Sequence, residues 1–364
     1  MDTKSMSAVL PLDPLEIGSE SSKDPPAVKL SPVASERSEP FSVNHTAPFM
    51  RSTWHKDPTK TSISNPLGWV AYRTMLKGEA RPREGKVAVH PLWTQHVFIL
   101  SRAIAPIAIQ YISMKYFHLS WPIWMAVIVY SIAYIAILAM TVVRLNALTL
   151  KHGFLDGHVP RDGIPDVRLK STVIGLLFFV TVRPLMYCLV AYDRFEMPYI
   201  TPWLPVHVFL FTTILDFWFY IYHRAMHEVD FLWRFHKTHH MAKHPIPLLA
   251  AFSDHVQELM DSFVIHMFAY FVYPLDFFTL WICAIYIEYV ELCGHSGVRL
   301  FCNHPVSGPI LRPFDMDLSV EDHDLHHRHG WRKSFNYGKQ TRVWDKLFGT
   351  TRARVEMAEE NLDR

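Results

Sequence analysis

The sequence predicts an all-α protein, a multi-pass transmembrane helical bundle with a helical cap on the cytosolic side of the membrane. Half of the 364 residues are apolar and only 19% are charged, and the charges crowd the N-terminal region and the polar loops. The segment 121–143 carries no charge and exceeds the roughly 20 residues that a helix needs to cross hydrocarbon. A soluble all-helical protein with an apolar core is the alternative, but this run is uncharged on every face.

Both ends of the chain are polar. Residues 1–66 are rich in Ser, Pro, Lys and Glu without periodicity, so we expect a disordered tail with no cleavable signal peptide. Residues 67–96 place basic side chains between aromatic ones, which is typical of an interfacial segment or of an ordinary basic flank. Residues 351–364 form a polar C-terminal tail. The formal net charge of +2 gives no indication of nucleic-acid binding.

Transmembrane helices are expected in residues 97–204, and a further apolar run leads directly into a histidine motif. The four expected runs are 97–117, 121–143, 171–192 and 204–222. The basic loop 144–170 is expected on the cytosolic side, which puts the end of the fourth run there too. A last apolar stretch, 262–292, contains Pro274 and Asp276, and we expect a hairpin that enters the membrane and returns.

Histidine is the unusual residue, with 22 copies, and most of them are clustered. Spacings of three and four residues place imidazoles on one face of a helix. Three short motifs contain eight of them: His223 and His227; His236, His239 and His240; His323, His326 and His327. Eight imidazoles are too many for one tetrahedral zinc, so the sequence predicts two metal ions with nitrogen-rich ligands. Packed histidines without metal are the alternative, which three motifs make improbable.

Two further histidines are candidate ligands. His295 follows an apolar helix and shares its face with Glu288 and Glu291. His255 lies in a polar segment, where a surface histidine is the alternative. Five others are expected to be non-ligands: His207, His244, His266, His304 and His329. The four cysteines show no CxxC spacing, which excludes a zinc knuckle and indicates reduced thiols.

Two carboxylates inside apolar segments are candidate functional residues, because a buried charge in a membrane span needs a partner. Asp216 lies seven residues before His223 and could orient a ligand imidazole; an ion pair with Arg183 is the alternative. Glu291 could serve the metal site near His295. For Glu291 the alternative is a salt bridge to Arg299 or Arg312.

Five motifs in residues 205–350 resemble those of the fatty acid hydroxylase and sterol desaturase superfamily of integral-membrane di-iron enzymes. They are DFWFYIYHRAMH (216–227), HKTHH (236–240), HSG (295–297), HDLHH (323–327) and NYGKQTRVWDKLFGT (336–350). The resemblance implies that 205–350 is the catalytic domain and that the motif histidines are metal ligands. His255 and His295 match places where methylsterol oxidase-like members have histidine. Val256 and Val298 depart from the family pattern.

The resemblance implies an oxidoreductase that hydroxylates or desaturates an unactivated C–H position of a sterol, terpenoid or other lipid. Its cofactors would be two iron ions and O2, with electrons from NAD(P)H through cytochrome b5 or a reductase. Its location would be the endoplasmic reticulum, with the histidines facing the cytosol. The HSG and HDLHH forms favour sterol-like substrates, and fatty-acyl hydroxylation is the alternative. A zinc-dependent membrane hydrolase or a metal carrier is a different class, and the complete motifs argue against an inactive scaffold.

Overall fold

A computed structural model describes residues 48–157, 159–332 and 334–363. The expected disordered tail lies outside the described residues as far as residue 47. Between residues 48 and 66 the structure differs from the prediction, because this segment forms the short helices η1 (Pro48–Met50), η2 (Trp54–Lys56) and α1 (Pro58–Thr61).

Contacts with residues 164–166 explain why the segment from residue 48 to residue 66 is folded. The indole of Trp54 is buried and donates to the Ile164 carbonyl at 2.9 Å. The carboxylate of Asp166 accepts from the backbone N–H groups of Thr53 and Trp54. A polar segment is thus ordered by one buried aromatic side chain and a carboxylate more than a hundred residues away, which the composition of the segment does not reveal.

Five helices of the described chain are long and apolar enough to cross a membrane. They are α3 (Leu92–Phe117), α4 (Ile123–His152), α5 (Leu169–Ala191), α6 (Leu204–Glu228) and α10 (Phe277–Gly294). The expected multi-pass, mostly helical bundle is therefore confirmed, and the chain is a membrane protein with several spans. The runs expected at 97–117, 121–143, 171–192 and 204–222 each lie largely within one of these helices.

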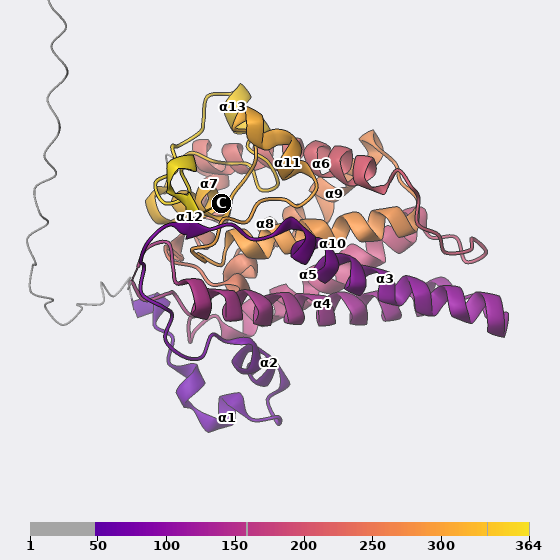
Figure 1. The fold of residues 1–364 in the computed structure, drawn as a ribbon. Helices are drawn as coiled ribbons and strands as arrows, with labels where there is room; N and C mark the ends of the chain where they lie inside the picture. Colours follow the sequence, from indigo (N-terminus) through magenta and orange to yellow (C-terminus); the bar gives the residue numbers. More distant parts are fainter. Residues whose placement is uncertain (1–47, 158, 333, 364) are drawn as a thin grey trace, which may run out of the picture. The chain divides into compact units, whose positions relative to one another are not determined.

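Helix α10 is the core of the bundle. It contacts each of the other four long helices, and all of its residues are buried. The others expose large apolar side chains, such as Ile128 and Ile132 on α4 and Leu189 on α5, as expected for helices that face lipid. In Figure 1 the long helices run alongside one another, with α7 and α12 near one end of them.

Shorter elements complete the chain. The helix α2 (Pro66–Thr74) precedes the bundle, and strands β1 (Val87–Ala88) and β2 (Leu362–Asp363) pair in parallel. The others are α7 (Asp230–His236), η3 (His239–Met241), η4 (Pro247–Ala251), α8 (His255–Leu259), the π-helical η5 (Met260–Val264), α9 (Ile265–Val272), α11 (Ser307–Leu311), η6 (Arg312–Phe314), α12 (Val320–His329), α13 (Val343–Leu347) and η7 (Glu359–Asn361). The stretch where a hairpin was expected contains α9 and α10, joined by residues 273–276; α9 packs on α6. The Asp276 side chain caps α10 by accepting from Thr279 N–H.

Residues after 350 hold the start of α12. The Glu321 carboxylate accepts from the backbone N–H groups of residues 355–357. The guanidinium of Arg354 donates to the carboxylate of Asp322, which also caps α12 together with Ser319. The polar C-terminal tail of the sequence is therefore part of the support of α12.

Candidate metal centre

Four elements bring nine of the ten candidate histidines together. Helix α6 supplies His223 and His227, the end of α10 is followed by His295, and the α7–η3 segment and α12 each supply three. Their side-chain nitrogens form two groups, each within 4.8 Å: His223, His227, His236, His240 and His326 in the first; His239, His295, His323 and His327 in the second. The groups are adjacent, because the rings of His240 and His327 stack with centroids 5.0 Å apart.

Most Nδ1 atoms point away from the group centres toward an acceptor oxygen. A carbonyl oxygen can only accept, so each of these Nδ1 atoms carries the proton and Nε2 keeps its lone pair. In the first group the pairs are His223 with Tyr337 O (2.8 Å), His227 with Trp331 O (2.6 Å), His236 with Gln257 Oε1 (2.8 Å) and His326 with Phe335 O (2.7 Å). In the second they are His239 with Phe252 O (3.1 Å), His295 with Glu291 O (2.8 Å) and His327 with Ala242 O (2.9 Å).

The Nε2 atoms therefore face one another with lone pairs. His236 Nε2 lies 3.0 Å from His223 Nε2 and 3.1 Å from His227 Nε2, and neither contact has a hydrogen to share. Two nitrogens bound at right angles to one metal, each about 2.1 Å from it, would lie about 3.0 Å apart. The repulsion is relieved when a cation occupies the centre, so the donor set fits a metal ion in each group.

The imidazoles outside the spans are held neutral. Burial lowers the pKa of His236, His240 and His326 well below the usual value. In the second group, burial lowers the pKa of His295 to about 4 and that of His327 well below the usual value. Neutral imidazole is the form that binds metal, so the ligand set is ready at neutral pH.

His255 is not brought to either group, which corrects its place among the candidate ligands. Its side chain is 76% exposed and pairs with Glu258. The cause is local, because His255 is the first residue of α8, after the N-cap Asp254. The neighbouring Gln257 is the residue of this helix that reaches the site.

Asp216 is also placed differently from the expectation, since it orients no imidazole and does not pair with Arg183. Its buried carboxylate accepts from the backbone N–H groups of residues 339–341 and from the Thr341 hydroxyl. The carboxylate thus fixes the loop that carries Tyr337, whose carbonyl accepts the hydrogen bond from His223 Nδ1. Asp216 positions the site from a distance.

Glu291 touches the site through its backbone. Its carbonyl accepts from His295, while its carboxylate receives two hydrogen bonds of 3.1 Å from Arg183 and lies 3.4 Å from Lys339 Nζ. The alternative partners from the sequence are engaged elsewhere, Arg299 with Glu356 and Arg312 with Glu359. The sequence therefore indicated an ion pair correctly as an alternative but did not identify Arg183.

The comparisons with known proteins agree with this geometry. The family model for fatty acid hydroxylases matches residues 208–350. The fatty acid hydroxylase vlmA of Lecanicillium sp. is 39% identical over 333 residues, which cover 85% of this chain and 88% of that protein. The chain belongs to the fatty acid hydroxylase family. The resemblance to the fatty acid hydroxylase and sterol desaturase superfamily is thereby confirmed.

More distant relatives share only part of their length with this family member. Human cholesterol 25-hydroxylase is 32% identical over 150 residues, covering 40% of this chain and 51% of that protein. Human alkylglycerol monooxygenase is 28% identical over 185 residues, which cover 50% of this chain and 38% of that protein. No solved structure matches the chain.

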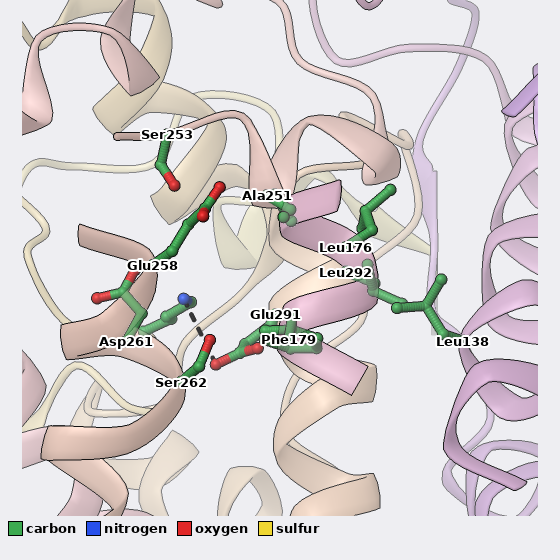
Figure 2. Close-up of a pocket in the computed structure, with 13 residues that line it drawn as sticks. Leu138, Leu176, Phe179, Ala251, Ser253, Glu258, Asp261, Ser262, Glu291 and Leu292 are labelled. Atoms are coloured by element: carbon green, nitrogen blue, oxygen red, sulfur yellow. Dashed lines mark ion pairs between the residues drawn. The ribbon is translucent and has the colours of Figure 1, made fainter. Parts of the chain in front are cut away.

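A small cavity lies behind the second histidine group of this fatty acid hydroxylase family protein. It has a volume of about 30 Å³ and is bounded by α4, α5, α10, residues 250–253 and the α8–η5 segment. Figure 2 shows Glu258 and Asp261 on one side, and Leu138, Leu176 and Leu292 on the other. Glu291 and Leu292 also line it, and the Glu291 carbonyl binds His295, so the cavity is separated from the imidazoles by little more than one helix backbone.

Gln257 was missed by the sequence reasoning, because a lone glutamine beside a histidine carries no motif. We expect Gln257→Leu to weaken metal binding about 10- to 100-fold, the usual effect of removing the partner that orients a ligand imidazole. Gln257→Glu keeps an acceptor oxygen and is the matched control. Metal content after dialysis against graded chelator measures both; equal retention by Gln257→Leu and the unaltered protein would contradict the assignment.

Proposed function

We propose that the protein is an O2-dependent di-iron enzyme that hydroxylates or desaturates an unactivated C–H position of a membrane lipid. The observation that supports this most strongly is the pair of buried histidine groups with facing Nε2 lone pairs. The membership in the fatty acid hydroxylase family supports the reaction class.

Iron suits the donor set better than zinc does. The first group offers five nitrogens, whereas zinc takes four ligands in structural sites and three in catalytic sites. Imidazole suits iron as well as zinc, and a five-nitrogen shell leaves room for one more ligand in an octahedron. Two irons, one held in each group, would supply the activation of O2 that is needed to break an aliphatic C–H bond. The second group offers four nitrogens, a number that zinc also takes, so the preference for iron comes from the first group.

The chain's own residues bind, orient and exclude water. The carbonyls of Tyr337, Trp331 and Phe335 hold the imidazoles of the first group in one tautomer, and burial of the groups keeps water out. The cavity of Figure 2 is the candidate place for the reacting carbon, because Glu291, which lines it, binds His295 of the second group through its carbonyl.

We propose an alkyl chain as the substrate portion that enters this cavity. Leu138, Leu176 and Leu292 give one wall of the cavity an apolar surface on which a methylene segment would pack, while charged side chains line the rest of it: Glu258, Asp261, Glu291 and Lys339. The sequence had favoured sterol-like substrates. The 39% identity to a protein named fatty acid hydroxylase over most of its length also supports the acyl chain.

Lipid profiling of cells with and without the chain tests the function. We expect a lipid that gains one oxygen atom, or loses two hydrogen atoms, only when the chain is present, and about two irons in the purified protein. A fatty-acyl product would support the proposal that an alkyl chain enters the cavity. A sterol product would contradict that proposal and favour a polycyclic substrate. Zinc in place of iron, together with no O2 uptake in the presence of a reductant, would contradict the enzyme class.

We also propose that the protein lies in the membrane of the endoplasmic reticulum and that the histidine groups are on its cytosolic side. The basic loop that follows α4 supports this orientation. In sealed microsomes whose cytosolic face is outside, protease added to the suspension should cleave a tag at position 150 and a tag at position 330. Protection of either tag would overturn the orientation.

A further inference from the structure

One large aromatic side chain connects the first histidine group to the surface. The Trp331 carbonyl accepts the Nδ1 proton of His227 at 2.6 Å, and the Trp331 side chain is 46% exposed. The other residues whose oxygen accepts from an Nδ1 of the two groups are buried or half-buried in the described chain. Trp331 is therefore the exposed member of the set.

A second tryptophan continues the connection inward. The Trp331 ring packs edge-on against Trp233 with centroids 5.0 Å apart. Trp233 in turn lies 5.3 Å from the ring of His227, 6.1 Å from that of His236 and 5.9 Å from that of His240. Two aromatic rings and one hydrogen bond thus lead from the surface to three imidazoles of one group.

The surface around Trp331 is basic. The Lys243 ammonium lies 4.9 Å from the centroid of the Trp331 ring and donates to the Gly330 carbonyl at 2.6 Å. Lys237 is exposed and lies one helical turn after Trp233. Arg332 is exposed too, but its charge is matched by an ion pair with Asp230. Lys237 and Lys243 make no ion pair with a described residue, so their charges are available to a partner.

We propose that Lys237, Lys243 and Trp331 form an electron-entry patch, on which an acidic one-electron carrier protein docks. The lysines attract the carrier, because complementary charge sets encounter rate and orientation, and the tryptophans would pass electrons to the iron that the first histidine group would hold. The proposal rests on the proposed function. In a hydroxylation two carriers are each oxidised by one electron, and O2, two electrons, two protons and the C–H substrate give the alcohol and water.

The test uses the full chain with iron bound, in lipid nanodiscs, and the soluble domain of an acidic b-type cytochrome as the probe. Binding of the oxidised cytochrome is measured by surface plasmon resonance at low and high salt. Reoxidation of the reduced cytochrome is followed by its absorbance with O2 present. The variants are Lys237→Glu/Lys243→Glu and Trp331→Leu, and the controls are Lys56→Glu and Trp93→Leu, which change an exposed lysine and an exposed tryptophan elsewhere.

The lysine variant should associate with the cytochrome at least about tenfold more slowly at low salt, and the difference should shrink at high salt. Trp331→Leu should bind the cytochrome within about twofold of the unaltered chain. It should reoxidise the cytochrome more slowly, because the ring that packs against Trp233 is lost, and it should retain its iron. If Trp331→Leu loses iron, its reoxidation rate is not used, and the salt-dependent binding of the cytochrome to Lys237→Glu/Lys243→Glu alone tests the patch.

Binding and reoxidation equal to those of the controls would overturn the patch while leaving the enzyme assignment intact. An unaltered chain that contains no iron and takes up no O2 with a chemical reductant would instead overturn the proposed function. The two failures are therefore distinguishable in one set of measurements.

Discussion

His239→Ala should lower turnover by more than about 100-fold and release metal from the second histidine group. Loss of a residue that only orients a ligand already costs about 10- to 100-fold, and His239 is one of four nitrogens in its group. Its Nδ1 also bonds the Phe252 carbonyl, so the substitution leaves a buried acceptor without its donor. Metal content and product formation, measured on the membrane-inserted protein, check both effects.

His255→Ala is the matched control, because it removes the candidate histidine that the structure places outside both groups. It should keep both metals and turn over within about twofold of the unaltered protein, since exposed substitutions usually change little. Loss of metal in this variant would mean that the α8 segment rearranges to bring His255 into the site. Retained turnover in His239→Ala would remove the second group from the reaction.

Glu291→Met should destabilise the protein by about 3–5 kcal/mol, because it leaves the Arg183 charge inside the bundle without its partner. Arg183→Met should cost less, because Lys339 Nζ stays 3.4 Å from the Glu291 carboxylate. The pair joins α5 to α10 through two hydrogen bonds, and the Arg183 side chain is fully buried. The double variant Arg183→Met/Glu291→Met should recover more than half of the loss, since replacing a buried ion pair by apolar residues is often neutral. Lys339, which also contacts Glu291, limits the recovery.

The four buried cysteines supply the measurement, because a thiol-reactive dye labels them only when the bundle opens. Thermal unfolding of the purified protein with this dye gives the stability of the two single variants and the double one. If the double variant is no more stable than Glu291→Met, loss of the ion pair is not the source of the lower stability of Glu291→Met. A Glu291→Met protein that is stable but inactive would restore Glu291 as a candidate for a role in the chemistry.

The spans and the histidine motifs could be predicted because both are local patterns. An uncharged run of 23 residues such as 121–143 has few other structures open to it, and spacings of three and four residues place imidazoles on one face. His295 was predictable for the same reason, since it follows directly on an apolar helix. The helices α3 to α6 therefore lie largely where the sequence placed them, although α4 continues to His152, into the stretch expected as a loop, and α10 takes up only the second part of the stretch expected as a hairpin.

The partners of the buried charges could not be predicted, because they depend on packing between distant segments. Asp216 is satisfied by backbone groups more than a hundred residues later, and backbone N–H groups leave no trace in a sequence. Arg183 and Glu291 meet only because α5 packs on α10. His255 and Gln257 differ by two positions, and the orientation of α8 decides which of them reaches the site.

The clamp on α12 determines when the two groups can form during synthesis. All nine histidines have been synthesised once His327 is made, but the start of α12 is held by Arg354 and by residues 355–357. A nascent chain that ends between these points has its spans and every imidazole, yet its last three imidazoles lie on an unanchored helix. Both groups draw ligands from α12, the first His326 and the second His323 and His327, so we expect neither group to be complete until the last residues of the C-terminal segment have folded onto that helix.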